Sequence, residues 1–276
     1  MKIALVQQRA SADPSENLAR GKKAFLRAVE AGARLVAFAE LAFSRFLPGE
    51  RATPLRLAAA EPIPGPTTEL FSGLCRDHAA VAVLNLFEIR GRRTYDASPV
   101  IDADGRLAGV TRMMHIMDGP GFREKGYYAP GPAGPLVHDT RLGRVGVAVC
   151  YDRHFPEYMR VLGLRDADIV IVPQAGVVDE WGEGVFEAEL QAAALQNGYY
   201  AALVNRVGRE GINDFSGESF VVDPFGRVTA RAPGRRESLL IAEVDFRLRK
   251  RCPAARHFLR DRRPEAYRRF GLARKR

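Results

Sequence analysis

The sequence has few cysteines and no long apolar run. Its 276 residues include three cysteines, Cys75, Cys150 and Cys252, which are widely spaced and form no Cys-x-x-Cys motif. An odd number in this pattern argues against a disulfide framework and against a zinc site. No apolar stretch approaches the roughly 18 residues that a membrane span needs, and the N-terminal MKIALVQQRA holds too few apolar residues for a secretory signal. We therefore expect a cytoplasmic protein without metal or membrane contact.

Flexible linkers and low-complexity segments are also lacking. A chain of this length can bury a large core, and no Ser/Gly-rich stretch marks a boundary within it. We predict a single domain over residues 1–276.

Positive charge dominates only one part of the chain. The formal net charge is +9, but residues 246–276 contain thirteen Lys or Arg and two acidic residues, so the remainder is close to neutral. A basic segment of this kind can hold an anion, form a solvated helix face or contact a second subunit. Because no RNA-binding aromatic motif accompanies it, we do not expect nucleic acid as a partner.

Apolar segments of two kinds alternate along the sequence. Strands are predicted over 2–7, 34–38, 81–87, 98–102, 107–113, 143–149, 168–172, 200–205, 217–222, 227–230 and 238–244, and helices over 15–31, 67–78, 155–164 and 185–196. Alternation of this kind, interrupted by hairpins, predicts an α/β fold with mixed sheets covered by helices. The pattern alone leaves three-layer and four-layer stacking open.

Cys150 is the strongest candidate for a reactive group. It follows an apolar strand and precedes a tight turn and a helix that starts at Pro156. At such a junction, backbone N–H groups can stabilise a thiolate and an oxyanion, which predicts a lowered thiol pKa. The alternative is a buried structural cysteine, the common fate of free cysteines. Cys75, within a predicted helix, and Cys252, in the basic segment, are expected to be structural.

Two glutamates are candidates to assist Cys150. Glu40 follows the buried strand 34–38, where an unpaired carboxylate is costly and a raised pKa would suit a general base. The alternative for Glu40 is a solvated side chain at a strand end. Glu124 lies in a loop rich in glycine and aromatic residues and means little by itself.

Taken together, these segments resemble the nitrilase superfamily of carbon–nitrogen hydrolases in motif, order and spacing, in particular the branches that act on N-carbamoyl amino acids and β-ureidopropionate. The resembling motifs are FAEL at 38–41, RMMHI at 112–116, EKGYY at 124–128, GVAVCYD at 146–152, NRVG at 205–208, FSGES at 215–219, DPFG at 223–226 and DRRPE at 261–265. They extend over nearly the whole chain.

The resemblance implies a four-layer αββα sandwich that pairs into homodimers or larger homo-oligomers. It implies hydrolysis of amides, N-carbamoyl groups or nitriles without metal or organic cofactor. Carried over by motif, Glu40 is the general base, Cys150 the nucleophile and Glu124 a second glutamate that positions groups in the site. The backbone N–H of Tyr151 would donate to the oxyanion.

Met113 departs from the family pattern. Members usually have lysine at this place in the motif, whereas this chain reads Arg112-Met113-Met114. A thioether carries no charge and donates no hydrogen bond. Lys125 and Arg112 are the nearest cations in sequence, but each matches a residue that the family has in addition to that lysine. We therefore expect slow turnover.

The turn after Cys150 bears on the substrate. By the resemblance, Arg153 and His154 lie where relatives that cleave N-carbamoyl amino acids bind the substrate carboxylate, and a guanidinium suits a carboxylate. Gln174 is a further candidate for substrate binding. Alternatively, Arg153 pairs with Asp152 or Glu157 and has a scaffold role.

The sequence thus predicts a hydrolase that cleaves a non-peptide C–N bond of a small, carboxylated amide or N-carbamoyl compound through a Cys150 thioester. Two alternatives stay open. The first is a binding protein that keeps the pocket and has lost turnover through Met113. The second is a Cys–His amidase that uses His154 as base, and nitrile hydrolysis is a lesser possibility.

Overall fold

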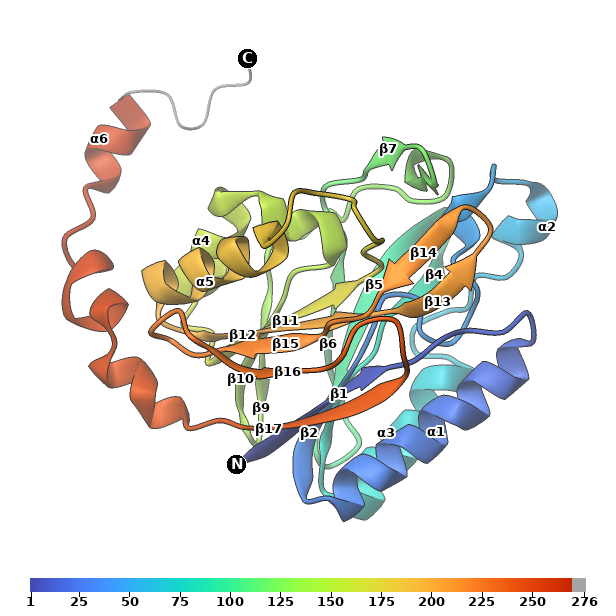
Figure 1. Ribbon diagram of the computed structural model, residues 1–276, viewed down its shortest axis with the longest axis horizontal. Coiled ribbons are helices and arrows are strands. Elements are labelled where there is room, and N and C mark those ends of the chain that lie inside the picture. Colours follow the sequence, from blue (N-terminus) through green and yellow to red (C-terminus); the bar gives the residue numbers. More distant parts are fainter. Residues whose placement is uncertain (270–276) are drawn as a thin grey trace.

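Two mixed β-sheets pack face to face in the computed structural model, which describes residues 1–269 (Figure 1). The first sheet has the order β17 (Ser238–Glu243), β1 (Lys2–Gln7), β2 (Ala33–Phe38), β3 (Val81–Val83), β5 (Arg93–Ile101) and β4 (Leu86–Arg90), with β6 (Leu107–Arg112) also paired to β5. The second has the order β16 (Val228–Arg231), β15 (Phe220–Val222), β12 (Tyr200–Asn205), β11 (Ile169–Gln174), β10 (Gly143–Val147) and β9 (Val137–Thr140).

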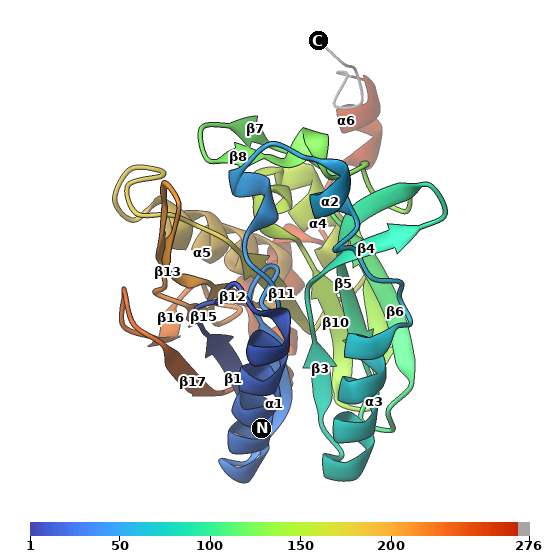
Figure 2. The same ribbon diagram turned by 90° about the vertical axis from the view of Figure 1, so that its right-hand side faces the viewer.

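Helices cover the outer face of each sheet. The first sheet is covered by α1 (Pro14–Glu30) and α3 (Pro66–His78), and the second by α4 (Pro156–Leu164) and α5 (Val185–Asn197). Figure 2 shows the two helix pairs on opposite sides of the sheets. Apolar clusters fill all three interfaces between layers. The expected four-layer αββα sandwich is therefore confirmed, and it resolves the layer count that the hydrophobic pattern left open.

The parallel strands bring distant residues to one end of the sandwich. Strands β1, β2 and β3 run parallel in one sheet, as do β10, β11 and β12 in the other. Ala39, just past β2, and Val149, just past β10, belong to the same central apolar cluster between the sheets. The residues that follow them, Glu40 and Cys150, consequently meet although they are far apart in sequence.

Several element boundaries differ from those expected. The strand predicted over 81–87 is interrupted at Leu84 and Asn85, and its two parts, β3 and β4, pair with the same edge of β5 in one antiparallel register, while β6 pairs with the opposite edge. The strand predicted over 143–149 ends at Val147, and the one predicted over 217–222 begins at Phe220. Smaller elements were not predicted, namely β7 (Asp118–Gly119), β8 (Phe122–Arg123), β13 (Val207–Glu210), β14 (Asn213–Ser216), α2 (Pro54–Leu57) and η1 (Leu47–Gly49).

The basic C-terminal segment leaves the sandwich. After β17 it continues as η4 (Phe246–Arg251), η5 (Ala254–Phe258) and α6 (Pro264–Arg269), along the ends of α4 and α5 (Figure 1). Part of its charge is neutralised by the body, since Arg249 pairs with Asp166 and Asp168. Its last three basic residues, Arg274, Lys275 and Arg276, lie outside the described residues. Over residues 1–269, no helix has the length and apolar character required to cross a membrane.

Candidate active site

Cys150 lies where the chain turns from β10 into a short 3-10 helix, η3 (Cys150–His154). Its φ angle is +44°, in the left-handed region that residues other than glycine rarely adopt. Such a conformation costs on the order of 1–3 kcal/mol and is found at functional turns, including the strand-to-helix turns that present nucleophiles. The side chain is 5% exposed. The expected strand–turn–helix junction is thus present, and its backbone is strained.

Glu40 is held at the end of β2 by a buried network. The next residue, Leu41, also has a positive φ, of 46°, and its N–H donates to Asn85 Oδ1 over 2.7 Å. The buried guanidinium of Arg206 donates to the carbonyl of Glu40 over 2.9 Å and also to that of Leu41. The Glu40 side chain itself is fully buried. The structure therefore excludes the alternative of a solvated glutamate.

Two more carboxyl groups are buried beside Glu40. Asp96 lies on β5, and Glu124 opens the 3-10 turn η2 (Glu124–Gly126); both are fully buried. Asp96 Oδ1 accepts from the Asn85 amide, and Glu124 Oε2 accepts from the Met117 N–H over 3.0 Å. The other oxygen of each, Asp96 Oδ2 and Glu124 Oε1, has no hydrogen-bond partner of normal geometry in the described chain.

Burial and charge repulsion raise the pKa of each of these acids. Burial raises the pKa of Glu40 well above its ordinary range, and Asp96 and Glu124 raise it further. The pKa of Asp96 is raised to about 7 and that of Glu124 to about 8, in both cases mainly by burial. The Tyr128 hydroxyl is buried among the same three groups, and its pKa is raised too. The raised pKa expected for Glu40 is thus present, and burial is its largest cause, as expected.

The pKa of the Cys150 thiol is raised, and the prediction of a lowered value was wrong. Burial is the largest cause, and Glu40 and Glu124 add to it, whereas Arg153 lowers the thiol pKa. Backbone N–H groups at the turn do not outweigh these effects. A thiolate would therefore have to form by proton transfer to a neighbour, and Glu40 is close enough for its thiol contact to stabilise the carboxylate form.

Met113 is fully buried in the apolar cluster that also contains Cys150. Its N–H donates to the carbonyl of Asp96 over 2.9 Å, which places its backbone beside the carboxyl groups. Neither nearby cation compensates for the missing lysine. Lys125 is exposed to solvent, and Arg112 pairs with the buried carboxylate of Glu88.

Arg153 is buried and contacts the backbone of Cys150. Its Nη1 donates to the carbonyl of Cys150 over 3.1 Å and to Gln174 Oε1 over 2.9 Å. Its Nε lies 3.4 Å from a carboxylate oxygen of Glu189, and Nη2 has no hydrogen-bond partner of normal geometry within residues 1–269. The scaffold partners proposed from the sequence were wrong, because Asp152 accepts from His115 and Glu157 is exposed. Arg153 and Gln174 are thus brought together beside the thiol.

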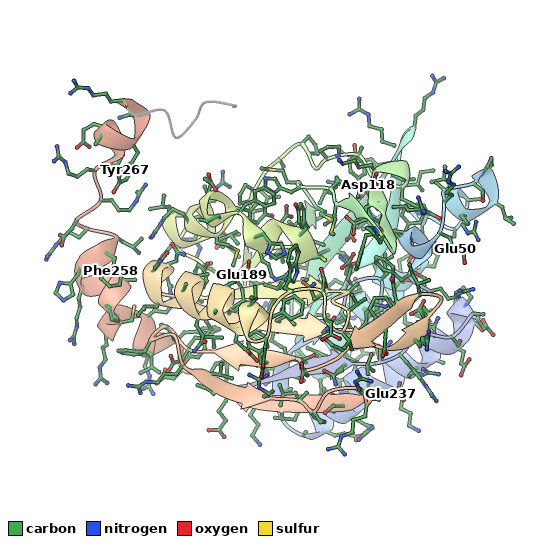
Figure 3. All side chains as sticks on the ribbon, turned by 45° about the horizontal axis from the view of Figure 1, so that its top comes forward. Glu50, Asp118, Glu189, Glu237, Phe258 and Tyr267 are labelled. Carbon is green, nitrogen blue, oxygen red and sulfur yellow. The ribbon has the colours of Figure 1, made fainter. Side chains whose placement is uncertain are left out.

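His154 shares the carboxylate of Glu189 with Arg153. Its Nδ1 is 2.6 Å from Glu189 Oε1, and its ring meets the exposed Trp181 edge-on at 5.0 Å between centroids. Glu189 lies on α5, as Figure 3 shows. No hydrogen bond of His154 to the Cys150 thiol is present in the described part of the chain, so the geometry does not favour His154 as the base.

A pocket of about 450 Å³ opens next to the site and is lined by residues 177–187 together with Ser216, Glu218, Gly234 and Arg235. Glu180 links the pocket to the site, because its charge raises the pKa of both Cys150 and Glu124. The lining is acidic: it contains Asp179, Glu180, Glu183, Glu187 and Glu218 against a single cationic side chain, Arg235.

Four residues of this site received no role from the sequence. Tyr128 and Arg206 lie within the motifs EKGYY and NRVG, which was a signal for both. Asp96 and Glu189 offered only a charge among apolar neighbours.

Alkylation should distinguish the three cysteines. We expect iodoacetamide to modify Cys150 first, because it alone has a buried base beside it and a neighbouring pocket. Cys75 is fully buried with a pKa raised to about 12, and the fully buried Cys252 donates its thiol to the Arg249 carbonyl. Peptide mapping after brief exposure measures the order. Modification of Cys252 with Cys150 untouched would exclude Cys150 as the nucleophile.

The fold and the site define an αββα sandwich protein with a buried cysteine and a buried glutamate at the meeting ends of its two sheets. Residues 2–254 match the model of the carbon-nitrogen hydrolase family. The chain belongs to this family and is a carbon–nitrogen hydrolase, as its motifs predicted.

Known relatives agree with this assignment. The chain is 32% identical to a citrullinase of Francisella tularensis, over 97% of this chain and 96% of that protein. It is 30% identical to an N-carbamoylputrescine amidase of Solanum lycopersicum, over 96% and 93%. The crystal structure of a carbon-nitrogen hydrolase from Helicobacter pylori G27 superimposes with a TM-score of 0.92 at 29% identity and covers 100% of this chain and 99% of that one.

Proposed function

We propose that this protein hydrolyses the amide or N-carbamoyl group of a small carboxylated molecule, with Cys150 as nucleophile and Glu40 as general base. The observation that carries the proposal is the buried contact between Glu40 and Cys150. The backbone turns sharply at both places, because Cys150 itself and Leu41, the residue after Glu40, have positive φ angles. The names of two relatives, citrullinase and N-carbamoylputrescine amidase, support an N-carbamoyl substrate.

The chemistry follows from the raised pKa values of both groups. Glu40 takes the proton of the Cys150 thiol as the sulfur attacks the carbonyl carbon, so that no free thiolate accumulates in the buried site. The backbone N–H of Tyr151 donates to the resulting oxyanion. The C–N bond then breaks and the leaving nitrogen takes the proton from Glu40, which leaves an acyl-enzyme on Cys150. Water, deprotonated by Glu40, frees the thiol, while Glu124 positions the reacting groups.

Arg153 is proposed to bind the substrate carboxylate. Its Nη2 is buried without a partner of normal geometry, as a donor reserved for a ligand would be. Gln174 orients the guanidinium through Nη1, and the adjacent His154 forms the outer wall.

Replacing Arg153 with glutamine should raise KM for carboxylated substrates and leave uncharged amides nearly unaffected. The loss of a charge-assisted hydrogen bond should cost on the order of 2–3 kcal/mol. Steady-state kinetics on a carboxylated amide and its uncharged analogue measure the difference. Equal losses on both would assign Arg153 to the scaffold, where its bond to the Cys150 carbonyl would then be its role.

A second candidate function is ligand binding without turnover. Met113 favours it, because the site lacks the cation that would stabilise an oxyanion. Ammonia release from a panel of N-carbamoyl amino acids, simple amides and nitriles separates the two functions: binding without ammonia would identify a binding protein. Release from nitriles alone would identify a nitrile hydrolase.

The assembly is part of the same proposal. We propose that residues 1–276 form a single hydrolase domain that pairs with a second copy. The central apolar cluster joins both sheets, and the C-terminal segment presents the exposed side chains of Phe258 and Tyr267, which a partner could cover (Figure 3).

A further inference from the structure

The carboxyl groups of the site have buried oxygens that no protein group satisfies. Apart from the nearby Cys150 thiol and the mutual contact between Glu40 and Asp96, both oxygens of Glu40 have no hydrogen-bond partner of normal geometry in residues 1–269, and the same is true of Asp96 Oδ2, Glu124 Oε1 and the Tyr128 hydroxyl. These four residues come from three separate segments of the chain and are all at least nine-tenths buried. Unsatisfied buried polar groups are costly and rare. Several of them around one nucleophile indicate a ligand that brings hydrogen-bond donors.

Within residues 1–269, no lysine or arginine side chain hydrogen-bonds to the carboxyl groups of Glu40, Asp96 or Glu124. The guanidinium of Arg206 is used by backbone carbonyls and by Glu210, and that of Arg153 by the Cys150 carbonyl, Gln174 and Glu189. No group of three or more His, Cys, Asp or Glu side chains in residues 1–269 could hold a metal ion. An organic cation with N–H donors is therefore the ligand that best complements the carboxyl groups.

The clustered carboxyl groups also influence which chemical group Cys150 can attack. Attack of a thiol on a neutral carbonyl creates an oxyanion, which the carboxylates of Asp96 and Glu124 would destabilise. Attack on an amidinium or guanidinium carbon instead gives a neutral tetrahedral adduct, so no oxyanion donor is needed and an apolar side chain such as Met113 is no handicap. Carboxylates bind the planar N–H groups of such cations in bidentate fashion.

We propose that this site also hydrolyses the amidinium or guanidinium group of a small molecule, converting it into the corresponding amide or ureido compound and ammonium, with Asp96 and Glu124 binding the cationic N–H groups. The proposal rests on the nucleophilic role proposed for Cys150. If the substrate also carries a carboxylate, Arg153 binds it as above.

The reaction balances without a further reagent. The thiol proton passes to Glu40 as the S–C bond forms, and the positive charge of the substrate is neutralised in the adduct. A C–N bond breaks, and ammonia leaves with the proton from Glu40, so that an S-linked amidinium remains on Cys150. Water attacks its carbon and gives one proton to Glu40. The C–S bond breaks, the thiolate recovers that proton, and the second proton of the water converts ammonia into ammonium.

The neighbouring pocket supports a cationic substrate independently. It is lined by five carboxylates and one arginine, and one of these carboxylates, Glu187, pairs with Arg231. Trp181, 41% exposed, offers an aromatic face at the same pocket. An acidic pocket with an aromatic side chain attracts organic cations and repels free anions.

Two matched pairs of compounds test the proposal. The first pair, 2-chloroacetamidine and 2-chloroacetamide, alkylates thiols and differs only in the cationic group; rates at Cys150 are divided by rates with free glutathione at the same pH. The second pair, 4-guanidinobutyrate and 4-ureidobutyrate, is assayed for ammonia release. The Met113→Lys variant places a cation in the cluster, and Met114→Lys is its control, because Met114 packs in a different apolar cluster.

We expect the corrected alkylation rate to be at least tenfold higher for the amidine, and ammonia to be released faster from the guanidino compound. Met113→Lys should abolish both preferences, whereas Met114→Lys should keep them. Preference for the amide and turnover of the ureido compound alone would overturn the proposal and leave the proposed function intact. Failure of both reagents to modify Cys150, with no ammonia from any compound, would overturn both. An amidine preference without guanidine turnover would also overturn the proposed activity.

Discussion

Replacing Met113 with lysine should raise kcat at least tenfold on a neutral amide or N-carbamoyl substrate. Met113 is fully buried in the same apolar cluster as Cys150, and its backbone is bonded to Asp96. A lysine there would donate to the oxyanion, and one such donor is typically worth about 10²–10³-fold in kcat, roughly 2.7–4 kcal/mol. Its charge would also lower the pKa of Glu40 and Glu124. Steady-state kinetics on purified variants measure the gain.

Met113→Ala is the matched control for this substitution. Alanine removes the thioether without adding a donor, so kcat should change little. Folding of both variants is checked by thermal unfolding, because a buried lysine is tolerated only if the carboxyl groups compensate for its charge. Brisk turnover by the native chain together with slower turnover by Met113→Lys would show that another group serves the oxyanion.

Replacing Glu40 with glutamine should lower kcat by about 10²–10⁴-fold, the usual contribution of a general base. The thiol pKa is raised by burial, so Cys150 depends on a neighbour that accepts its proton, and glutamine accepts none. Native activity should rise with pH through the neutral range, because the raised pKa of Glu40 keeps it protonated at lower pH. A pH–rate profile of both proteins measures this.

Glu237→Gln is the control for the loss of a carboxylate. Glu237 lies at the surface, where it pairs with Arg9 and Arg20 (Figure 3), and its removal should leave kcat unchanged. Stability provides a second readout, because Glu40→Gln removes repulsion with Asp96 and Glu124 and should not lower the unfolding temperature. Turnover by Glu40→Gln within threefold of the native rate would assign the base to another group.

The pattern of apolar residues predicted the bounds of several buried strands. The strands Lys2–Gln7 and Tyr200–Asn205 were predicted at their observed bounds, because a run of apolar residues buried on both faces has clear ends. The strand predicted over 81–87 is interrupted at Leu84 and Asn85, although both of its parts pair with the same edge of β5. At the interruption the Asn85 side chain hydrogen-bonds to Leu41, Asp96 and Ser98, partners that only the folded sheet brings together.

In the site, too, the residues within local motifs were predicted, whereas properties that depend on contacts between distant segments were not. The motifs around Glu40, Glu124 and Cys150 identified the residues that the fold brings together. Asp96 could not be found in this way, because a lone aspartate in a strand gives no sign of which carboxyl groups it will face. The thiol pKa was predicted with the wrong sign, since burial between two sheets is a tertiary effect that the strand–turn–helix pattern does not contain.

The account depends most directly on a covalent intermediate at Cys150. The deciding measurement is denaturing mass spectrometry of the native protein, quenched during ammonia release from an N-carbamoyl or amide substrate, with Cys150→Ser in parallel. We expect an added mass equal to the acyl group, located on the peptide that contains Cys150, and neither adduct nor ammonia from Cys150→Ser. Undiminished ammonia release by Cys150→Ser would contradict the account.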